Sequence, residues 1–160
     1  MRNNMTLQLR TASVDDLEPL LQLEQSCFDS DQLGRVNLRY LLQSPTAHVR
    51  LIEQLTHDQF SVVGYSIGLT RANSKIWRIY SLAVAAQARG QGIAARLIED
   101  SLIRAKQLGC QTVSLEVMTT NTAALALYRR FGFEVTDLLA QYYENGEDGY
   151  RMRLTLREPN

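Results

Sequence analysis

Residue types that mark specialised classes of protein are scarce in this sequence. Its 160 residues include two cysteines, three prolines and one tryptophan. The two cysteines, Cys27 and Cys110, are far apart and each lies inside an apolar pattern, which excludes a disulfide-rich scaffold and predicts buried thiols in a reducing compartment. His48 and His57 lie in polar segments without a supporting motif, so neither predicts a catalytic partner for a cysteine.

Net charge and long apolar runs are also absent. The 17 lysines and arginines balance 17 aspartates and glutamates, which removes the basic footprint of a general nucleic-acid binder but allows a small anionic ligand in a local site. No run of eighteen apolar residues occurs, and residues 1–6 lack the apolar stretch of a signal peptide. We therefore expect a cytoplasmic protein that binds neither nucleic acid nor a membrane.

What is present fits one ordinary globular domain. Apolar residues make up 45% of the chain and charged residues 21%, without repeats or low-complexity stretches, so we expect residues 1–160 to form a single domain. Hydrophobic periodicity predicts the order β-α-α-β-β-β-α-β-α-β-β, a mixed α/β sheet. In residue numbers the predicted elements are 7–10, 13–24, 38–42, 49–51, 62–69, 77–84, 92–109, 111–117, 121–131, and a final hairpin of 133–143 with 150–156.

One loop has the chemistry of an anion site. The segment Arg89-Gly90-Gln91-Gly92-Ile93-Ala94 joins a strand that ends at Val84 to a helix that begins near Gly92. Glycines let the backbone approach a ligand closely, and the free amides of a first helical turn point outward at the positive end of the helix dipole. The pattern favours a bound phosphate, although a tight turn without a ligand also fits the loop taken alone.

Two other phosphate-binding motifs compete for this loop. The Walker motif is absent, because no Gly-Lys-Ser/Thr follows. The dinucleotide fingerprint G-x-G-x-x-A is satisfied by residues 90–95, with Glu116 at the end of the next strand. That fingerprint usually opens a series of alternating strands and helices, whereas this loop follows a run of strands. A dinucleotide enzyme is therefore the less favoured alternative.

The loop and its neighbours together resemble a known family. Arg89-x-x-Gly92-x-Ala94 resembles the Q/R-x-x-G-x-G/A signature of the GNAT acetyltransferases. The resemblance extends from about residue 79 to 152, and in particular to the ribosomal-protein-alanine N-acetyltransferases, which share a Tyr-Tyr pair before the last hairpin turn. Its further motifs are Leu115-Glu116-Val117, Asn121-x-x-Ala124-x-x-Leu127-Tyr128, Phe131-Gly132-Phe133 and Tyr142-Tyr143. It implies a mostly antiparallel sheet flanked by helices.

The resemblance also implies the donor and its binding residues. Acetyl-CoA would be the co-substrate, without a metal, and its acetyl and pantetheine groups would lie along one strand while its pyrophosphate binds the loop amides. The implied cofactor-binding residues are Leu82, Ala83, Val84, Arg89, Gly90, Gln91, Gly92, Ile93, Ala94, Ala95 and Asn121. Asn121 has a second interpretation, as the residue that caps the next helix.

The same resemblance implies the catalytic residues. Glu116 would be the general base and Tyr128 the general acid that protonates the departing thiolate. Pattern alone favours a solvated strand face for Glu116 and a core residue with its hydroxyl at an edge for Tyr128, and it is the resemblance that favours the catalytic roles. Tyr142 and Tyr143 alternate on the predicted penultimate strand, so we expect one to border the acceptor and the other to pack.

The sequence identifies the acceptor less precisely than the donor. An α-amine has a pKa near ~8 and a lysine near ~10.4, so a carboxylate base favours a protein or peptide N-terminus, with lysine or small amines as alternatives. A non-catalytic acyl-CoA sensor is the alternative from another class. After Cys27-Phe28 the chain continues Asp29-Ser30-Asp31-Gln32, where alanine-specific relatives often have Pro-Trp, which leaves the acceptor unassigned. The sequence predicts neither acyl-chain preference nor oligomeric state.

Overall fold

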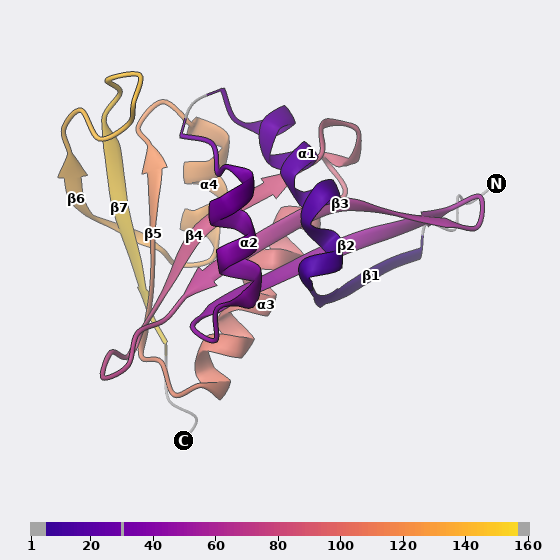
Figure 1. Cartoon of the computed structure of the whole chain (residues 1–160). Coiled ribbons are helices and arrows are strands. Elements are labelled where there is room, and N and C mark those ends of the chain that lie inside the picture. Colours follow the sequence, from indigo (N-terminus) through magenta and orange to yellow (C-terminus); the bar gives the residue numbers. More distant parts are fainter. Residues whose placement is uncertain (1–5, 30, 157–160) are drawn as a thin grey trace. The chain divides into compact units, whose positions relative to one another are not determined.

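The structure is a computed structural model, and it describes residues 6–29 and 31–156. Its helices and strands follow one another in the predicted order (Figure 1). The strands are β1 (Thr6–Thr11), β2 (Ala47–Thr56), β3 (Gln59–Leu69), β4 (Ile76–Val84), β5 (Thr112–Met118), β6 (Glu134–Leu139) and β7 (Gly149–Thr155). The helices are α1 (Leu17–Cys27), α2 (Arg35–Gln43), α3 (Ile93–Gln107) and α4 (Thr122–Arg130), with 3-10 turns η1 (Val14–Asp16) and η2 (Ala86–Ala88).

Seven strands form one sheet in the order β1-β2-β3-β4-β5-β7-β6. β1 pairs with β2, β5 with β7 and β7 with β6 in antiparallel fashion, whereas β4 and β5 run parallel. Parallel neighbours need a crossover connection, and α3 lies in the connection between these two strands. The predicted mixed, mostly antiparallel α/β fold is therefore confirmed.

The chain divides into two compact units. The first contains the residues up to Ile67 together with Ser81–Ile98, and the second contains Gly68–Tyr80 together with the residues from Glu99 onward. β3, β4 and α3 each contribute residues to both units. Each unit has its own buried apolar residues, and a single domain over residues 1–160 remains a proposal.

In the first unit, the core forms between α1, α2 and the strands they cover. α2 packs against both α1 and β2. The buried residues of α1 recur at helical spacing, so they share one face; they are Leu17, Leu20, Leu21, Leu23 and Glu24. On β3, a Cβ at Gly64 would lie 2.8 Å from Cγ2 of Ile93, so the absence of a side chain lets the first turn of α3 lie directly on the strand.

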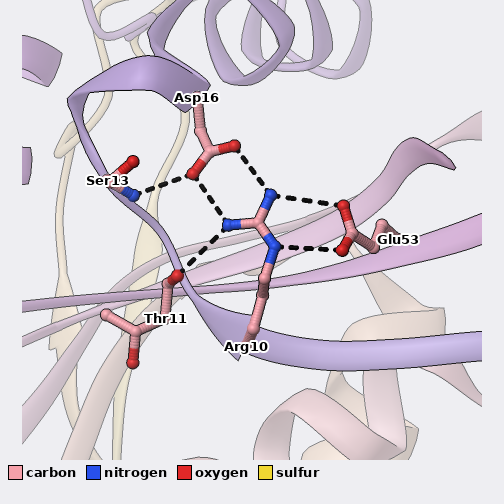
Figure 2. Close-up of polar contacts among 5 residues, drawn as sticks. All are labelled: Arg10, Thr11, Ser13, Asp16 and Glu53. Carbon is pink, nitrogen blue, oxygen red and sulfur yellow. Dashed lines mark hydrogen bonds and ion pairs between the residues drawn. The ribbon is translucent and has the colours of Figure 1, made fainter.

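A charged cluster ties the start of α1 to the first two strands (Figure 2). Arg10 on β1 donates to both oxygens of Asp16 at 2.8 and 2.9 Å, and to both oxygens of Glu53 on β2 at 3.0 and 3.2 Å. The amide of Ser13 donates to Asp16 at 2.8 Å. Ser13 and Asp16 thus form a capping box at the start of η1, and Asp16 is buried in contact with the guanidinium of Arg10.

This cluster predicts a pH-dependent contribution to stability. Hydrogen bonds from Arg10 hold the pKa of Asp16 below its usual value. A carboxylate with a lowered folded pKa stabilises the protein fully above its unfolded pKa, and the contribution is lost as the pH falls through the lower, folded value. Asp16→Asn should therefore lower the free energy of unfolding by about 1–2 kcal/mol at pH 7, and the deficit should shrink below about pH 4.

Urea denaturation at pH 7 and pH 3 measures this difference. Asp15→Asn is the matched control, because Asp15 is the exposed neighbour in the same 3-10 turn. We expect the control to differ little from the wild type at either pH. An Asp16→Asn deficit of the same size at pH 3 and pH 7 would contradict the assigned role.

In the second unit, the core is built around Trp77. This residue is 1% exposed and lies opposite Val113 in the parallel β4–β5 register. Gly68 on β3 faces its indole ring, and a Cβ at Gly68 would lie 2.2 Å from two ring carbons. The neighbouring strands and α4 add further buried side chains, namely Leu115, Leu125, Phe133 and Met152.

Candidate active site

The predicted phosphate loop has the backbone of an open anion site. Gly90 and Gly92 have φ of +80° and +75°, a left-handed conformation that glycine adopts without steric cost. No atom lies within 4 Å of a Cβ placed at either residue. Both positions therefore favour glycine because of their left-handed backbone, and the space beside them is open to a ligand.

The start of α3 supplies the hydrogen-bond donors. The amide of Arg96 donates to the carbonyl of Gly92 at 3.1 Å, so the amides before Arg96 have no acceptor in the preceding turn of the helix. No acidic residue lies in this first turn to compete with an anion. Ile93 is 1% exposed and anchors the turn. The local geometry is that of a helix N-terminus with free amides, the kind of backbone to which phosphates bind in proteins.

The segment predicted to bind the acetyl group, residues 82–84 of β4, is partly buried and contacts α1. Ala83 is buried, while Leu82 and Val84 are half-buried. The thiol of Cys27, at the end of α1, donates to the carbonyl of Val84 at 3.4 Å. Cys27 is therefore a half-buried thiol with a hydrogen-bond partner, whereas Cys110 is buried as predicted, and both are free cysteines.

A buried polar network reaches Ser81, the residue of β4 that precedes this segment. Glu24 of α1 accepts hydrogen bonds from the hydroxyl of Tyr65 and from the amide of Leu33, the latter at 2.9 Å. The Tyr65 hydroxyl also lies 3.5 Å from the Ser81 hydroxyl. Burial, reinforced by the charge of Glu24, raises the pKa of Tyr65 above its ordinary value. The helical spacing of α1 places Glu24 on the apolar face, but the sequence does not name its partners, because they lie on other elements.

In the second unit, Glu116 lies on β5 between two arginines. Arg78 Nε donates to Oε2 at 3.2 Å, and Arg78 Nη2 lies 3.1 Å from Oε1. Arg151 pairs with Glu116 in the β5–β7 register, and its Nη2 lies 3.7 Å from Oε1. The carboxylate side chain is only 10% exposed, so the interpretation of a solvated face is wrong. Among the described residues, Oε2 accepts only the Arg78 contact, so it keeps acceptor capacity for an amine or for water.

Sequence analysis missed both arginines. Arg78 interrupts the apolar strand Trp77-Arg78-Ile79, and an isolated charge in such a strand is the one signal that points to it. Arg151 alternates with apolar residues as any solvated strand residue would. Neither pattern names Glu116 as the partner, since that pairing depends on which strands are neighbours.

Tyr128 lies on α4 with its ring edge-on to Phe133, at 5.8 Å between ring centroids. Burial raises the pKa of Tyr128 to about 12, because the phenolate is poorly solvated there. The hydroxyl therefore keeps its proton throughout the neutral range. This is the protonation state that a general acid needs before catalysis.

Asn121 caps α4, as one of its two interpretations predicts. Its Oδ1 accepts a hydrogen bond from the amide of Ala124 at 3.2 Å. This bond satisfies one of the free amides of the first helical turn. A contact between Asn121 and the cofactor remains a proposal.

The prediction that places Tyr142 and Tyr143 on the penultimate strand is wrong. β6 ends at Leu139, and Gln141 turns the chain with φ of +49° while its amide donates to Asp148 at 2.9 Å. Both tyrosines follow this turn, with their rings edge-on at 5.0 Å. The Tyr142 hydroxyl accepts a hydrogen bond from Arg78 at 3.4 Å. A side-chain-stabilised turn here overrides the strand preference of the aromatic pair.

Comparison with known proteins follows this geometry. A model of the acetyltransferase (GNAT) family matches residues 17–133. The chain belongs to this family. It is thus an N-acetyltransferase, and the family's acyl donor is acetyl-CoA.

Two relatives that the chain matches over most of their own length are named as N-acetyltransferases. The chain is 29% identical over 152 residues to a putative [ribosomal protein bS18]-alanine N-acetyltransferase of Bacillus subtilis, covering 94% of this chain and 96% of the relative. It is 30% identical over 153 residues to the N-terminal acetyltransferase A complex catalytic subunit NAA10 of Arabidopsis thaliana, covering 93% and 78%.

Solved structures share the fold. The ribosomal-protein-S18-alanine N-acetyltransferase of Escherichia coli superposes with a TM-score of 0.84 at 20% identity, covering 97% of both chains. Ard1 of Thermoplasma volcanium superposes with a TM-score of 0.82 at 23% identity, covering 95% of this chain and 99% of that one. The predicted family and fold are confirmed.

Within 6–29 and 31–156, no group of three or more histidine, cysteine, aspartate or glutamate side chains is placed to hold a metal ion. In the same ranges, no helix has the length and apolar character to span a membrane.

Proposed function

We propose that this acetyltransferase transfers the acetyl group of acetyl-CoA to the N-terminal α-amine of a protein or peptide. The observation that carries the proposal is the pair of open, left-handed glycines at the start of α3, in a chain that matches N-terminal acetyltransferases along its length. We extend to this chain the acceptor class that the names of those relatives state. A small amine is the alternative acceptor.

The donor site is proposed in the first unit. Acetyl-CoA would supply the activated acyl group as a thioester. The amides of Gly90, Gln91, Gly92, Ile93, Ala94 and Ala95 would bind the pyrophosphate, with the exposed guanidinium of Arg89 adding charge. Leu82, Ala83 and Val84 would hold the acyl and pantetheine groups through their main chain, which the contacts of Cys27 and Gly64 keep in place. Asn121 is proposed as an additional contact.

The proton transfers are proposed in the second unit. Glu116 would take a proton from the acceptor amine, directly or through water, as the new C–N bond forms. Tyr128 would donate its proton to the thiolate as the C–S bond breaks, so that CoA leaves as a neutral thiol. Tyr128 is protonated at neutral pH, which is the state that this role starts from, although burial makes the phenol a weaker acid than a solvated tyrosine.

The acid–base chemistry favours an α-amine over a lysine. At neutral pH roughly a tenth or more of an α-amine with a pKa near ~8 is already neutral, against less than about a thousandth of a lysine side chain. Glu116 shares its two oxygens with two arginines, so an acceptor that needs little help in losing a proton suits it best.

A matched pair of peptides tests this proposal. One peptide has a free N-terminus and no lysine, and the other has a blocked N-terminus and one lysine. We expect kcat/KM for the free N-terminus to exceed that of the lysine by roughly a hundredfold, as the difference in neutral amine implies. Release of the CoA thiol is the measurement. Faster reaction of the blocked lysine peptide, or of small amines such as polyamines, would reject the α-amine assignment.

A further inference from the structure

Four charged side chains form a row across the second unit. Arg78 on β4, Glu116 on β5, Arg151 on β7 and Asp137 on β6 alternate in sign along neighbouring strands. Glu116 contacts Arg78 at 3.1 Å and Arg151 at 3.7 Å, while Arg151 reaches Asp137 at 3.9 Å. The proposed base is therefore flanked by positive charge on both sides.

Of the two arginines, Arg78 has more contacts that hold its guanidinium in place. Its Nε and Nη2 contact Glu116, Nη2 also donates to the Tyr142 hydroxyl at 3.4 Å, and the guanidinium carbon lies 5.3 Å from the ring centroid of Tyr80. The side chain is still 38% exposed, and Nη1 has no acceptor in the part of the chain that the structure describes. A guanidinium held in this way presents a fixed donor edge, the geometry that recognises a carboxylate.

The charge around the base is positive. Arg78, Glu116 and Arg151 sum to one positive charge, and Asp137 offsets it only partly, because its side chain is 49% exposed and its contact is long. Between β6 and β7, Glu147 accepts a hydrogen bond from Thr120 at 3.0 Å and Asp148 accepts one from the amide of Gln141, so these two acids keep their charge but are held by groups other than the two arginines. An anionic group beside the amine gains an arginine partner, because the Arg78 side chain next to the base is partly exposed.

We propose that Arg78 and Arg151 select acceptors that carry a carboxylate next to the reacting amine. The carboxylate is either an acidic side chain in the first residues of a peptide or the α-carboxylate of a free amino acid. Arg78 makes the main contact through its open Nη1, and Tyr142 positions it. This inference rests on the proposed role of Glu116 as the base that the amine approaches.

Three peptides that differ at one residue test the inference. All begin with alanine, and the second residue is aspartate, asparagine or lysine; free aspartate is the fourth acceptor. For the wild type we expect kcat/KM to be about tenfold higher for the aspartate peptide than for the asparagine peptide, and lower still for the lysine peptide. High salt should reduce the preference, because both guanidinium groups are partly exposed.

Arginine substitutions separate selection from support of the base. In Arg78→Gln the ratio between the aspartate and asparagine peptides should fall towards one, even if all rates fall together. Arg151→Gln should reduce the ratio less. Arg153→Gln is the matched control, because Arg153 lies two residues along β7 from Arg151 and pairs with Ser114 rather than Glu116, and it should keep the wild-type ratio.

Each outcome of these experiments either upholds or overturns the inference. Equal rates for the aspartate and asparagine peptides in the wild type, or a ratio that survives Arg78→Gln, overturn the inference and leave the α-amine function standing. Turnover of free aspartate without turnover of any peptide upholds carboxylate selection and rejects the peptide acceptor. If no acceptor reacts, the proposed function fails, and calorimetric affinities of the three peptides in the presence of CoA decide the inference: equal affinities overturn it.

Discussion

Replacing Glu116 by glutamine is expected to lower kcat/KM by roughly 10²–10³, the range usual for loss of a general base. Glutamine preserves the shape and can still accept a hydrogen bond from Arg78, so the contacts at 3.1–3.2 Å need not collapse. The affinity for acetyl-CoA should change little, because the proposed phosphate-binding amides lie at the start of α3. Thiol release under saturating donor measures the loss.

Two companion variants sharpen this result. Glu134→Gln removes an exposed carboxylate from β6 in the same unit and should leave the rate unchanged. Tyr128→Phe should slow thiol release by roughly 10–10², since the ring can keep its contact with Phe133 while the proton donor is lost. If neither Glu116→Gln nor Tyr128→Phe slows thiol release with an active acceptor, the assigned catalytic roles are wrong.

Gly68→Ala is expected to be the most destabilising single methyl addition in the second unit. Its Cβ would lie 2.2–2.4 Å from three atoms of the Trp77 ring, well inside van der Waals contact. The indole is 1% exposed, so core side chains surround it. Overpacking of this kind costs about 1–3 kcal/mol and occasionally more, and we expect the free energy of unfolding to fall by an amount at the upper end of this range.

Gly34→Ala provides the matched control. A Cβ at Gly34 meets no atom within 4 Å, and its φ of −81° is open to any residue. Gly34 precedes α2, where alanine is a slightly poorer cap, so a loss below about 1 kcal/mol is expected. Urea denaturation compares the two variants. A Gly68→Ala protein as stable as Gly34→Ala would show that β3 and Trp77 rearrange freely.

Elements with a local cause were predictable. The apolar spacing of α3 and its end at Gly109, which has φ of +78°, follow from residues adjacent in the chain. The glycine loop was predictable for the same reason, because a left-handed backbone and the free amides of a first turn are set within a few residues. The strand predicted through Tyr143 failed because the carboxylate of Asp148, beyond the turn, binds the amide of Gln141.

The interpretation of Asp16 and Glu116 shows the limit of pattern alone. Asp16 follows Ser13 at the spacing of a capping box, which is a local signal, but its burial against Arg10 depends on how β1 and β2 pair. Glu116 alternates with apolar residues as a solvated side chain would, yet two arginines cover it. Charge on a strand does not reveal what faces it across the sheet.

By itself, then, the sequence determined the order of helices and strands, the open glycine loop at the start of α3 and the family to which these belong, because each is encoded by neighbouring residues. Only the tertiary structure decided the surroundings of Glu116. Arg78 lies 38 positions away in the chain and becomes its partner through the parallel pairing of β4 with β5, while Arg151 does so through the antiparallel pairing of β5 with β7. Strand register is a property of the whole sheet, and with it come the charges that we propose select the acceptor.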